Sequence, residues 1–296
     1  MQRQALRADL LMLLTAMIWG SGFIAQTTGM KHIGPFLYSG LRFALGSACL
    51  LPLLYWRGRQ LSRSVAQPRG QWAAGAAMGL ALALGINLQQ FGLQFTTVTN
   101  AGFITGLYVI VVPAVSLLLG QATGAGTWLG ACLAVAGMYL LSVNEHFEVA
   151  AGDWLQLVGA FVWAGHVLLV GYFASRYDVI RLAFIQFAVC ALASLALALL
   201  FEPLDGQAIL AAAPAVAYGG MVAAALGYTL QVIAQRHAIT SHAAIIFSLE
   251  AVFAAIAATL CLGEVLSPRG YLGCAVMLAG MLVAQLWPSR SHPVAA

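Results

Sequence analysis

The sequence predicts an all-α integral membrane protein with ten transmembrane helices, built as two inverted five-helix repeats. The first observation is composition: 62% of the 296 residues are hydrophobic and 7% are charged, far from the balance of a soluble domain. The second is that residues 70–144 contain no Asp, Glu, Lys or Arg, a run with room for about three spans of about 20 residues each. The third is an internal repeat, described below.

Charged residues, glycines and prolines divide the chain into apolar segments, each of which we interpret as one helix. The first segment follows Arg3 and Arg7, as a signal peptide would, but its end, IAQTTGM, lacks the small-x-small pattern of a cleavage site. We therefore expect this segment to be retained as a helix. The predicted helices cover residues 9–29, 35–56, 71–94, 99–119, 126–143, 153–175, 179–201, 211–235, 241–263 and 268–287.

Basic residues are divided unequally between the two sides that these spans define. Since cytoplasmic loops carry an excess of Lys and Arg, the richer side is predicted to be cytoplasmic, with both termini on it. This topology accounts for the net charge of +4, so no nucleic-acid partner is predicted. The richer side holds Arg3, Arg7, Arg57, Arg59, Arg63, Arg69, Arg176, Arg181, Arg236 and Arg290, and the other side holds Lys31 and Arg269.

The five cysteines all fall inside apolar spans, and their spacing does not match a metal site. We interpret them as small packing residues, and we predict neither a metal nor a cofactor. They are Cys49, Cys132, Cys190, Cys261 and Cys274.

The second half of the sequence repeats the first. The shift between the copies stays between 142 and 144 residues, and it aligns Trp19 with Trp163 and Tyr108 with Glu250. Three pairs of segments carry the alignment: DLLMLLTAMIWG from Asp9 with DWLQLVGAFVWA from Asp153, GINLQ from Gly85 with GYTLQ from Gly227, and WLGACLAVAGMYL from Trp128 with YLGCAVMLAGMLV from Tyr271.

A repeat unit of five helices is odd in number, so the second copy would enter the membrane upside down relative to the first. Inverted repeats are common in secondary transporters, where they surround a site near the bilayer midplane and rock between two open states. The alternative is a duplication that serves stability only. We predict two domains, residues 1–143 with the first five helices and residues 153–287 with the last five.

Further motifs lie in the first, fourth, ninth and tenth helices. They are LLTAMIWGSGFIAQ (13–26), TNAGFITGLYVIVVP (99–113), HAAIIFSLEAVFAA (242–255), LCLGE (260–264) and YLGCAVMLAG (271–280). In this order and spacing they resemble the drug/metabolite transporter superfamily and, within it, the ten-helix EamA family. Two positions depart from the family pattern. Ala251 stands where Pro usually follows the glutamate and would kink the helix, and Gln121 stands where Glu is common.

The resemblance implies an exporter of amino acids or other small metabolites in the cell inner (plasma) membrane. It also implies a central cavity lined by the first, third and fourth helices and their repeat mates. Relatives move very different solutes, so the resemblance does not identify the substrate.

Glu250 lies near the middle of the ninth predicted helix, where inserting an acidic side chain costs about 2.5–3.5 kcal/mol. Three arrangements would compensate this cost: an ionised carboxylate facing a wet cavity, a pair with Arg42, or a protonated and hydrogen-bonded carboxyl. The corresponding roles are substrate contact, a structural pair or cap, and proton coupling. His166, which shares a helical face with Trp163, is either a proton switch or a neutral hydrogen-bonding residue.

Polar residues form matching stripes on the third and eighth predicted helices: Asn87, Gln90 and Gln94 on one, Tyr228, Gln231 and Gln235 on the other. Each stripe occupies one helical face and would lack hydrogen-bond partners in lipid, so both are expected to point inward. They would line a cavity or bond between helices. Trp19 and Trp163 lie too deep for interfacial anchors and, together with Phe23, would add an aromatic wall. The predicted substrate-binding residues are Trp19, Phe23, Asn87, Gln90, Tyr108, Trp163, His166, Tyr228, Gln231 and Glu250.

Glycines at helical spacing clear one face of the fifth and of the tenth predicted helix. Gly130 and Gly137 lie seven residues apart, as do their repeat mates Gly273 and Gly280. Small residues of this kind let helices approach closely. They predict a tight contact, either within the chain or along the seam of a homodimer.

The predicted function is alternating-access export of a small neutral or zwitterionic metabolite, such as an amino acid, with this substrate and the lipid bilayer as partners. Arg42 is the single basic residue away from the ends of the predicted spans, too little positive charge for phosphorylated cargo. Proton-coupled multidrug efflux is the alternative. An intramembrane enzyme with Ser21 as nucleophile and His166 as base is the alternative from another class, and we predict that the protein is not an enzyme.

Overall fold

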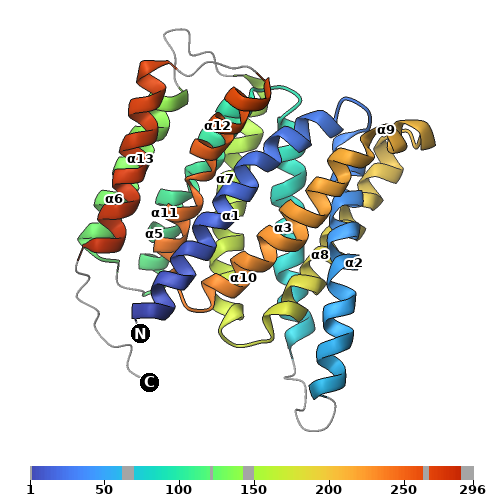
Figure 1. Ribbon diagram of the computed structural model, residues 1–296, viewed down its shortest axis with the longest axis horizontal. Coiled ribbons are helices and arrows are strands. Elements are labelled where there is room, and N and C mark those ends of the chain that lie inside the picture. Colours follow the sequence, from blue (N-terminus) through green and yellow to red (C-terminus); the bar gives the residue numbers. More distant parts are fainter. Residues whose placement is uncertain (1, 62–69, 121–122, 143–149, 263–266, 288–296) are drawn as a thin grey trace.

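The computed structural model describes residues 2–61, 70–120, 123–142, 150–262 and 267–287, and every regular element within these ranges is a helix (Figure 1). Some predictions fall on residues outside these ranges: Met1, Arg63, Arg69, Gln121, Arg290 and Ala296.

Nine helical segments of the described residues are long and apolar enough to cross a membrane, and α6 is a shorter apolar helix. Large apolar side chains such as Leu80, Leu199 and Leu210 are exposed on these helices, as expected for surfaces that face lipid. The multi-pass membrane fold is therefore confirmed. In chain order the elements are α1 (Gln2–Gly29), α2 (Pro35–Leu61), α3 (Gln71–Gly92), α4 (Val98–Gly106), α5 (Tyr108–Leu118), α6 (Ala125–Ser142), α7 (Ala151–Ala174), α8 (Val179–Phe201), α9 (Gly206–Ala217), η1 (Tyr218–Tyr228), α10 (Thr229–Gln235), α11 (Thr240–Phe247), α12 (Glu250–Leu262) and α13 (Pro268–Leu286).

The predicted fourth and ninth helices are interrupted at matching positions. Leu107 separates α4 from α5, and Ser248 and Leu249 separate α11 from α12. Leu107 and Leu249 are repeat mates, 142 residues apart. Tyr108 and Glu250 each begin the helix that follows the interruption, so the same backbone break positions both side chains.

The interruption before Glu250 forms without a proline. Ala251 occupies the usual proline position, yet α11 still ends at Phe247. The hydroxyl of Ser248 donates to the carbonyl oxygen of Ile245 at 2.8 Å. Such a side-chain bond to the preceding turn offers the backbone an alternative to regular helical pairing and often bends a helix.

The predicted eighth helix, residues 211–235, is divided into α9, η1 and α10, and η1 is a π-helix of 11 residues. A π-helix has i→i+5 hydrogen bonds and is rare, and it is often found at functional sites. Gly220 brings η1 close to α2, because a Cβ there would lie 2.8 Å from the carbonyl oxygen of Arg42. The repeat mate of this segment, α3, is a regular α-helix.

The helices pack in pairs that join the two halves of the chain. Helix α2 packs on α8, and Glu202 at the end of α8 accepts hydrogen bonds from the backbone N–H groups of Phe36 (2.8 Å) and Leu37 (2.7 Å) in the first turn of α2. At the other end of this pair, Arg57 of α2 forms a 3.6 Å ion pair with Asp178, which precedes α8. Each end of the α2–α8 pair is thus joined through a carboxylate.

Helices α6 and α13 pack side by side at the left edge of Figure 1. A Cβ at Gly130 would lie 2.6 Å from the carbonyl oxygen of Gly280, and one at Gly137 would lie 2.6 Å from that of Gly273. The glycine faces therefore make the predicted close contact within one chain. They are not free to form the seam of a homodimer, and the predicted homodimer stays a prediction.

The direction of the chain can be followed in Figure 1. Helix α1 begins, and α13 ends, at the lower end of the bundle in that view. Helix α2 ends there and α3 and α8 begin there, so Arg57 and Asp178 lie at this end as well.

Candidate functional site

A small cavity lies between the two halves of the chain. The space open to the centre of a water molecule within it is about 30 Å³, enough for a few waters but not for a metabolite without movement of the walls. Both halves contribute side chains. The lining residues are Trp19, Gly22, Phe23, Gln26, Arg42, Gln89, Thr105, Tyr108, Trp163, Val167, Ala223, Tyr228, Gln231 and Glu250.

Aromatic rings form one wall of the cavity, with Tyr228 among them. The ring centroids of Trp19 and Tyr228 are 4.6 Å apart with a 45° tilt, and Trp163 is stacked on Tyr228 at 6.3 Å with planes 16° apart. Glycines make room for both indoles: a Cβ at Gly85 would lie 3.2 Å from Trp163, and one at Gly227 would lie 2.9 Å from Trp19. The wall suits a flat or apolar group of a solute.

Arg42 and Glu250 bring opposite charges to the same cavity. Arg42 is 2% exposed and Glu250 is 5% exposed, yet they are not an ion pair, because within the described ranges the ion pair found is that of Arg57 and Asp178. Of the three arrangements considered for Glu250, the pair with Arg42 is therefore not formed. Arg42 instead lies over the ring of Phe43, with its guanidinium carbon 5.1 Å from the ring centroid, a contact that partly compensates a buried cation.

Several polar atoms at the cavity have no hydrogen-bond partner within the described part of the chain. They include the indole N–H groups of both tryptophans, the Tyr108 hydroxyl, two guanidinium nitrogens of Arg42 and both polar atoms of the Gln231 side chain. Buried polar groups are nearly always paired with protein, water or ligand. A concentration of unpaired donors at one cavity is therefore the chemistry of a site that receives hydrogen-bond acceptors.

Gln89 and Thr105 also line the cavity, although neither is among the residues predicted from the sequence. The Gln89 amide donates to the Thr105 hydroxyl at 3.5 Å, this hydroxyl donates to Gln156 Oε1 at 3.3 Å, and Gln156 Nε2 donates to the Gln89 carbonyl oxygen at 2.9 Å. The repeat alignment of GINLQ with GYTLQ pairs Gln89 with Gln231. That pairing, followed across both copies, would have identified Gln89.

Three predicted site residues do not line the cavity. Asn87 donates to the Ser194 hydroxyl at 2.8 Å, His166 Nε2 bonds Gln186 Oε1 at 3.0 Å, and Gln90 is fully buried. Asn87 follows the alternative in which a residue of the polar stripe bonds between helices, and the two alternatives for His166 stay predictions. The other predicted residues all line the cavity: Trp19, Phe23, Tyr108, Trp163, Tyr228, Gln231 and Glu250.

The pair of residues proposed for an intramembrane enzyme is not assembled. The hydroxyl of Ser21 bonds the hydroxyl of Tyr218 at 2.6 Å, whereas His166 bonds Gln186. Within the described ranges no group of three His, Cys, Asp or Glu side chains is placed to hold a metal ion.

The sequence of this chain is similar to those of known membrane transporters. The family model described as the EamA-like transporter family matches residues 6–143 and again residues 150–285. An uncharacterized transporter of Archaeoglobus fulgidus is 31% identical over 95% of this chain and 86% of its own length. A protein of Salmonella typhimurium named as a probable amino-acid metabolite efflux pump is 28% identical over 52% of this chain and 50% of its own. A solved crystal structure has the same fold, with a TM-score of 0.74 and 23% identity over 95% of this chain and 96% of that one.

Proposed function

Because this chain belongs to the EamA-like transporter family, we propose that it is a secondary transporter that exports a small zwitterionic or neutral metabolite, such as an amino acid, by alternating access. The observation that carries the proposal is that Arg42 and Glu250 line one cavity without forming an ion pair. A zwitterion offers a carboxylate to the guanidinium and an ammonium to the carboxylate, and so supplies both missing partners.

The rest of the cavity supports the same class of substrate. The indole N–H groups of Trp19 and Trp163 and the amide of Gln231 add uncharged hydrogen-bond donors. The aromatic wall around Tyr228 would cover an apolar side chain of the solute. A single cation is too little for the two negative charges of a phosphate monoester, and a single anion between an arginine and neutral donors is unfavourable for a cationic dye. The name of the Salmonella relative is consistent with an amino-acid metabolite.

Many alternating-access transporters are built from two related halves, and several contacts support the predicted inverted repeats. Trp163 of the second half packs on Gly85 of the first, and Trp19 of the first packs on Gly227 of the second. Trp19 is the repeat mate of Trp163, and Gly85 is the repeat mate of Gly227. The two contacts are therefore the same contact with the two halves interchanged. The α2–α8 and α6–α13 contacts each join a helix to its own repeat mate, which is what a pseudo-two-fold axis between the halves requires.

The proposed orientation follows from the arginines. Arg57, Arg176 and Arg181 lie near helix ends at the end of the bundle where α1 begins. By the excess of basic residues in cytoplasmic loops, we assign this end to the cytoplasm and the protein to the cell inner membrane.

Uptake by proteoliposomes tests the proposal. The panel compares amino acids, nucleosides and cationic dyes, with and without a pH gradient, for the wild type and for Arg42→Gln. We expect amino-acid transport by the wild type, lowered about tenfold or more in the variant because a charge-assisted hydrogen bond contributes about 1.5–3 kcal/mol.

Two other outcomes of this panel would contradict the proposal. Transport of dyes alone, driven by the pH gradient, would replace the proposal with proton-coupled multidrug efflux, in which Glu250 is the proton carrier. Normal amino-acid transport by Arg42→Gln would show that the guanidinium does not bind the substrate.

A further inference from the structure

A second recess lies away from the central cavity, at the lower ends of α2, α3 and α8 in Figure 1. The space within it that is open to the centre of a water molecule is about 220 Å³. None of its lining residues lines the central cavity. They are Leu54, Gln71, Trp72, Arg181, Phe184 and Ile185.

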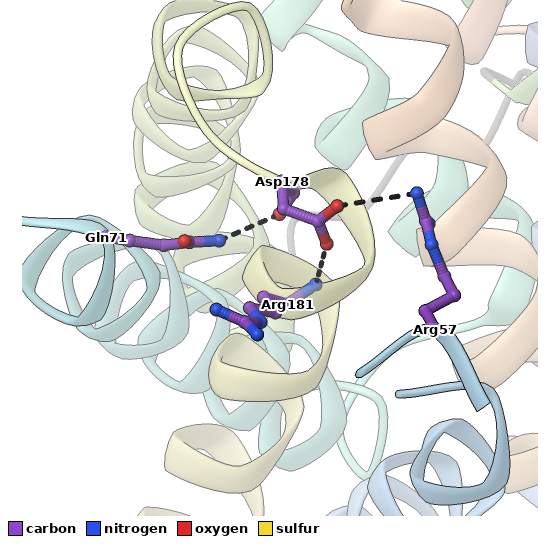
Figure 2. Close-up of polar contacts among 4 residues, drawn as sticks. All are labelled: Arg57, Gln71, Asp178 and Arg181. Carbon is purple, nitrogen blue, oxygen red and sulfur yellow. Dashed lines mark hydrogen bonds and ion pairs between the residues drawn. The ribbon is translucent and has the colours of Figure 1, made fainter. Parts of the chain in front are cut away.

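The recess contains a guanidinium that lacks a carboxylate partner. The nearby acid, Asp178, is already engaged: one carboxylate oxygen accepts from the backbone N–H of Arg181 at 2.9 Å, and the other pairs with Arg57 at 3.6 Å. The Asp178 carbonyl oxygen accepts from the Gln71 amide at 3.1 Å. Figure 2 shows that the Arg181 guanidinium points away from Arg57, toward the side where α3 lies. Across the described ranges, Arg181 takes part in no ion pair.

The remaining wall of the recess is apolar and open to the surroundings. Trp72 is 66% exposed although it is a large aromatic residue in the first turn of a spanning helix, and Leu54 and Phe184 are half-buried. Tryptophan is enriched at the level of the lipid headgroups, where its ring contacts both apolar and polar groups. An arginine above an apolar wall at this depth matches a molecule with an anionic head and a hydrocarbon tail.

We propose that this recess binds an anionic phospholipid of the surrounding leaflet, with its phosphate on Arg181 and an acyl chain along Trp72 and Phe184. The planar guanidinium matches phosphate geometry with two parallel hydrogen bonds. Basic pockets between membrane helices hold anionic headgroups in this way. A membrane lipid fits better than free phosphate because free phosphate would leave the apolar wall without a partner. The bound lipid would join α2, α3 and α8 at the end of the bundle where Arg57 and Asp178 form their ion pair.

Native mass spectrometry of the purified full-length protein tests the proposal, with phosphatidylglycerol and phosphatidylcholine of the same chain length as probes. We expect the wild type to retain phosphatidylglycerol preferentially and Arg181→Gln to lower this retention about tenfold, as for loss of charge-assisted hydrogen bonds. The matched control is Arg176→Gln, which removes an exposed arginine near the same end of the bundle, where its guanidinium stacks on Tyr172 outside the recess. This control should retain the lipid as the wild type does.

Trp72→Ala is the second variant, since it leaves the charge intact and removes the apolar wall. It should also lower phosphatidylglycerol retention, and added glycerol 3-phosphate should not displace the lipid from the wild type. Equal retention of the two lipids by the wild type, equal losses in Arg181→Gln and Arg176→Gln, or displacement by glycerol 3-phosphate would each overturn the proposal. The wild-type comparison and Trp72→Ala decide the matter even if Arg181→Gln does not fold.

Discussion

The two halves of the chain build one contact twice, on different backbones. Trp163 packs on Gly85 in the regular α-helix α3, whereas Trp19 packs on Gly227 at the end of the π-helix η1. The position of each tryptophan is duplicated, but the helix that receives it is not. The two halves therefore place matching side chains at the cavity, but the backbone on which those side chains pack and the chemistry of the lining differ between the halves.

The side chains at matching positions show the same divergence. Tyr108 and Glu250 both follow a break in their spans and both line the cavity, but one is a neutral phenol and the other a carboxyl group. Ile86 is the repeat mate of Tyr228 and does not line the cavity. Matching backbone positions therefore carry different side chains, which is consistent with the proposed binding of a zwitterion, a solute with two different ends.

The largest effect is expected from removing the charge that distinguishes the two halves. Glu250→Gln should lower the initial rate of amino-acid uptake about tenfold to a hundredfold, because a charge-assisted hydrogen bond contributes about 1.5–3 kcal/mol. Tyr108→Phe should lower it about two- to tenfold, since a neutral hydrogen bond contributes about 0.5–1.5 kcal/mol. Both rates are measured in proteoliposomes at equal protein content.

Asp9→Asn serves as the control for this comparison, because Asp9 is an acidic residue of α1 that does not line the cavity. It should transport at the wild-type rate. Equal losses in Glu250→Gln and Tyr108→Phe would mean that the asymmetry of the site has no role in binding.

A smaller effect is expected from filling the two glycine positions that receive the tryptophans. A Cβ at Gly227 would lie 2.9 Å from Trp19 Nε1, so the indole must shift, whereas at Gly85 the nearest atom of Trp163 is 3.2 Å away. We expect Gly227→Ala to destabilise the protein by about 1–3 kcal/mol and Gly85→Ala to destabilise it less. Thermal unfolding in detergent measures both.

The double variant Gly227→Ala with Trp19→Phe tests the cause, since the smaller ring removes the clash. It should be more stable than the sum of the single changes predicts, which a double-mutant cycle measures. Strict additivity would locate the strain elsewhere, for example in the π-helical backbone itself.

The membrane class, the span positions and the duplication were predictable because each depends on composition or on spacing along the chain. The interruptions were not, because they depend on local bonding that propensity does not reveal: the ninth span breaks at Ser248 although Ala251 replaces the usual proline. The π-helix was missed for a similar reason. Its glycines and alanines are compatible with either helical period, and packing against α1 and α2 accompanies the wider turn.

The candidate site was predictable where the depth of a residue in its span and the repeat alignment agreed, as for Trp19, Trp163 and Glu250. It was not predictable where the helical spacing of polar residues was the single guide. Asn87 and Gln90 share a helical face, but Asn87 bonds Ser194 and neither residue lines the cavity. The neighbouring residue, Gln89, does line it, because a rotation of one residue around the helix axis changes which face meets the cavity. Sequence periodicity identifies a polar face but not the partner that it meets.

The smallest effect on transport is expected from a comparison of two glutamines that share the same burial and the same lack of hydrogen-bond partners. Gln231 and Gln90 are both fully buried, and the side-chain amide of each lacks a partner within the described ranges, but only Gln231 lines the cavity. Gln231→Met should lower amino-acid uptake about two- to tenfold through loss of a neutral hydrogen bond to the solute. Gln90→Met should leave uptake unchanged, and its stability should not fall, since replacing an unpaired buried amide with an apolar group removes a desolvation cost. Equal transport by the two variants would mean that the Gln231 amide does not contact the substrate. The contribution of the second half to the site would then rest on Glu250, Tyr228 and Trp163.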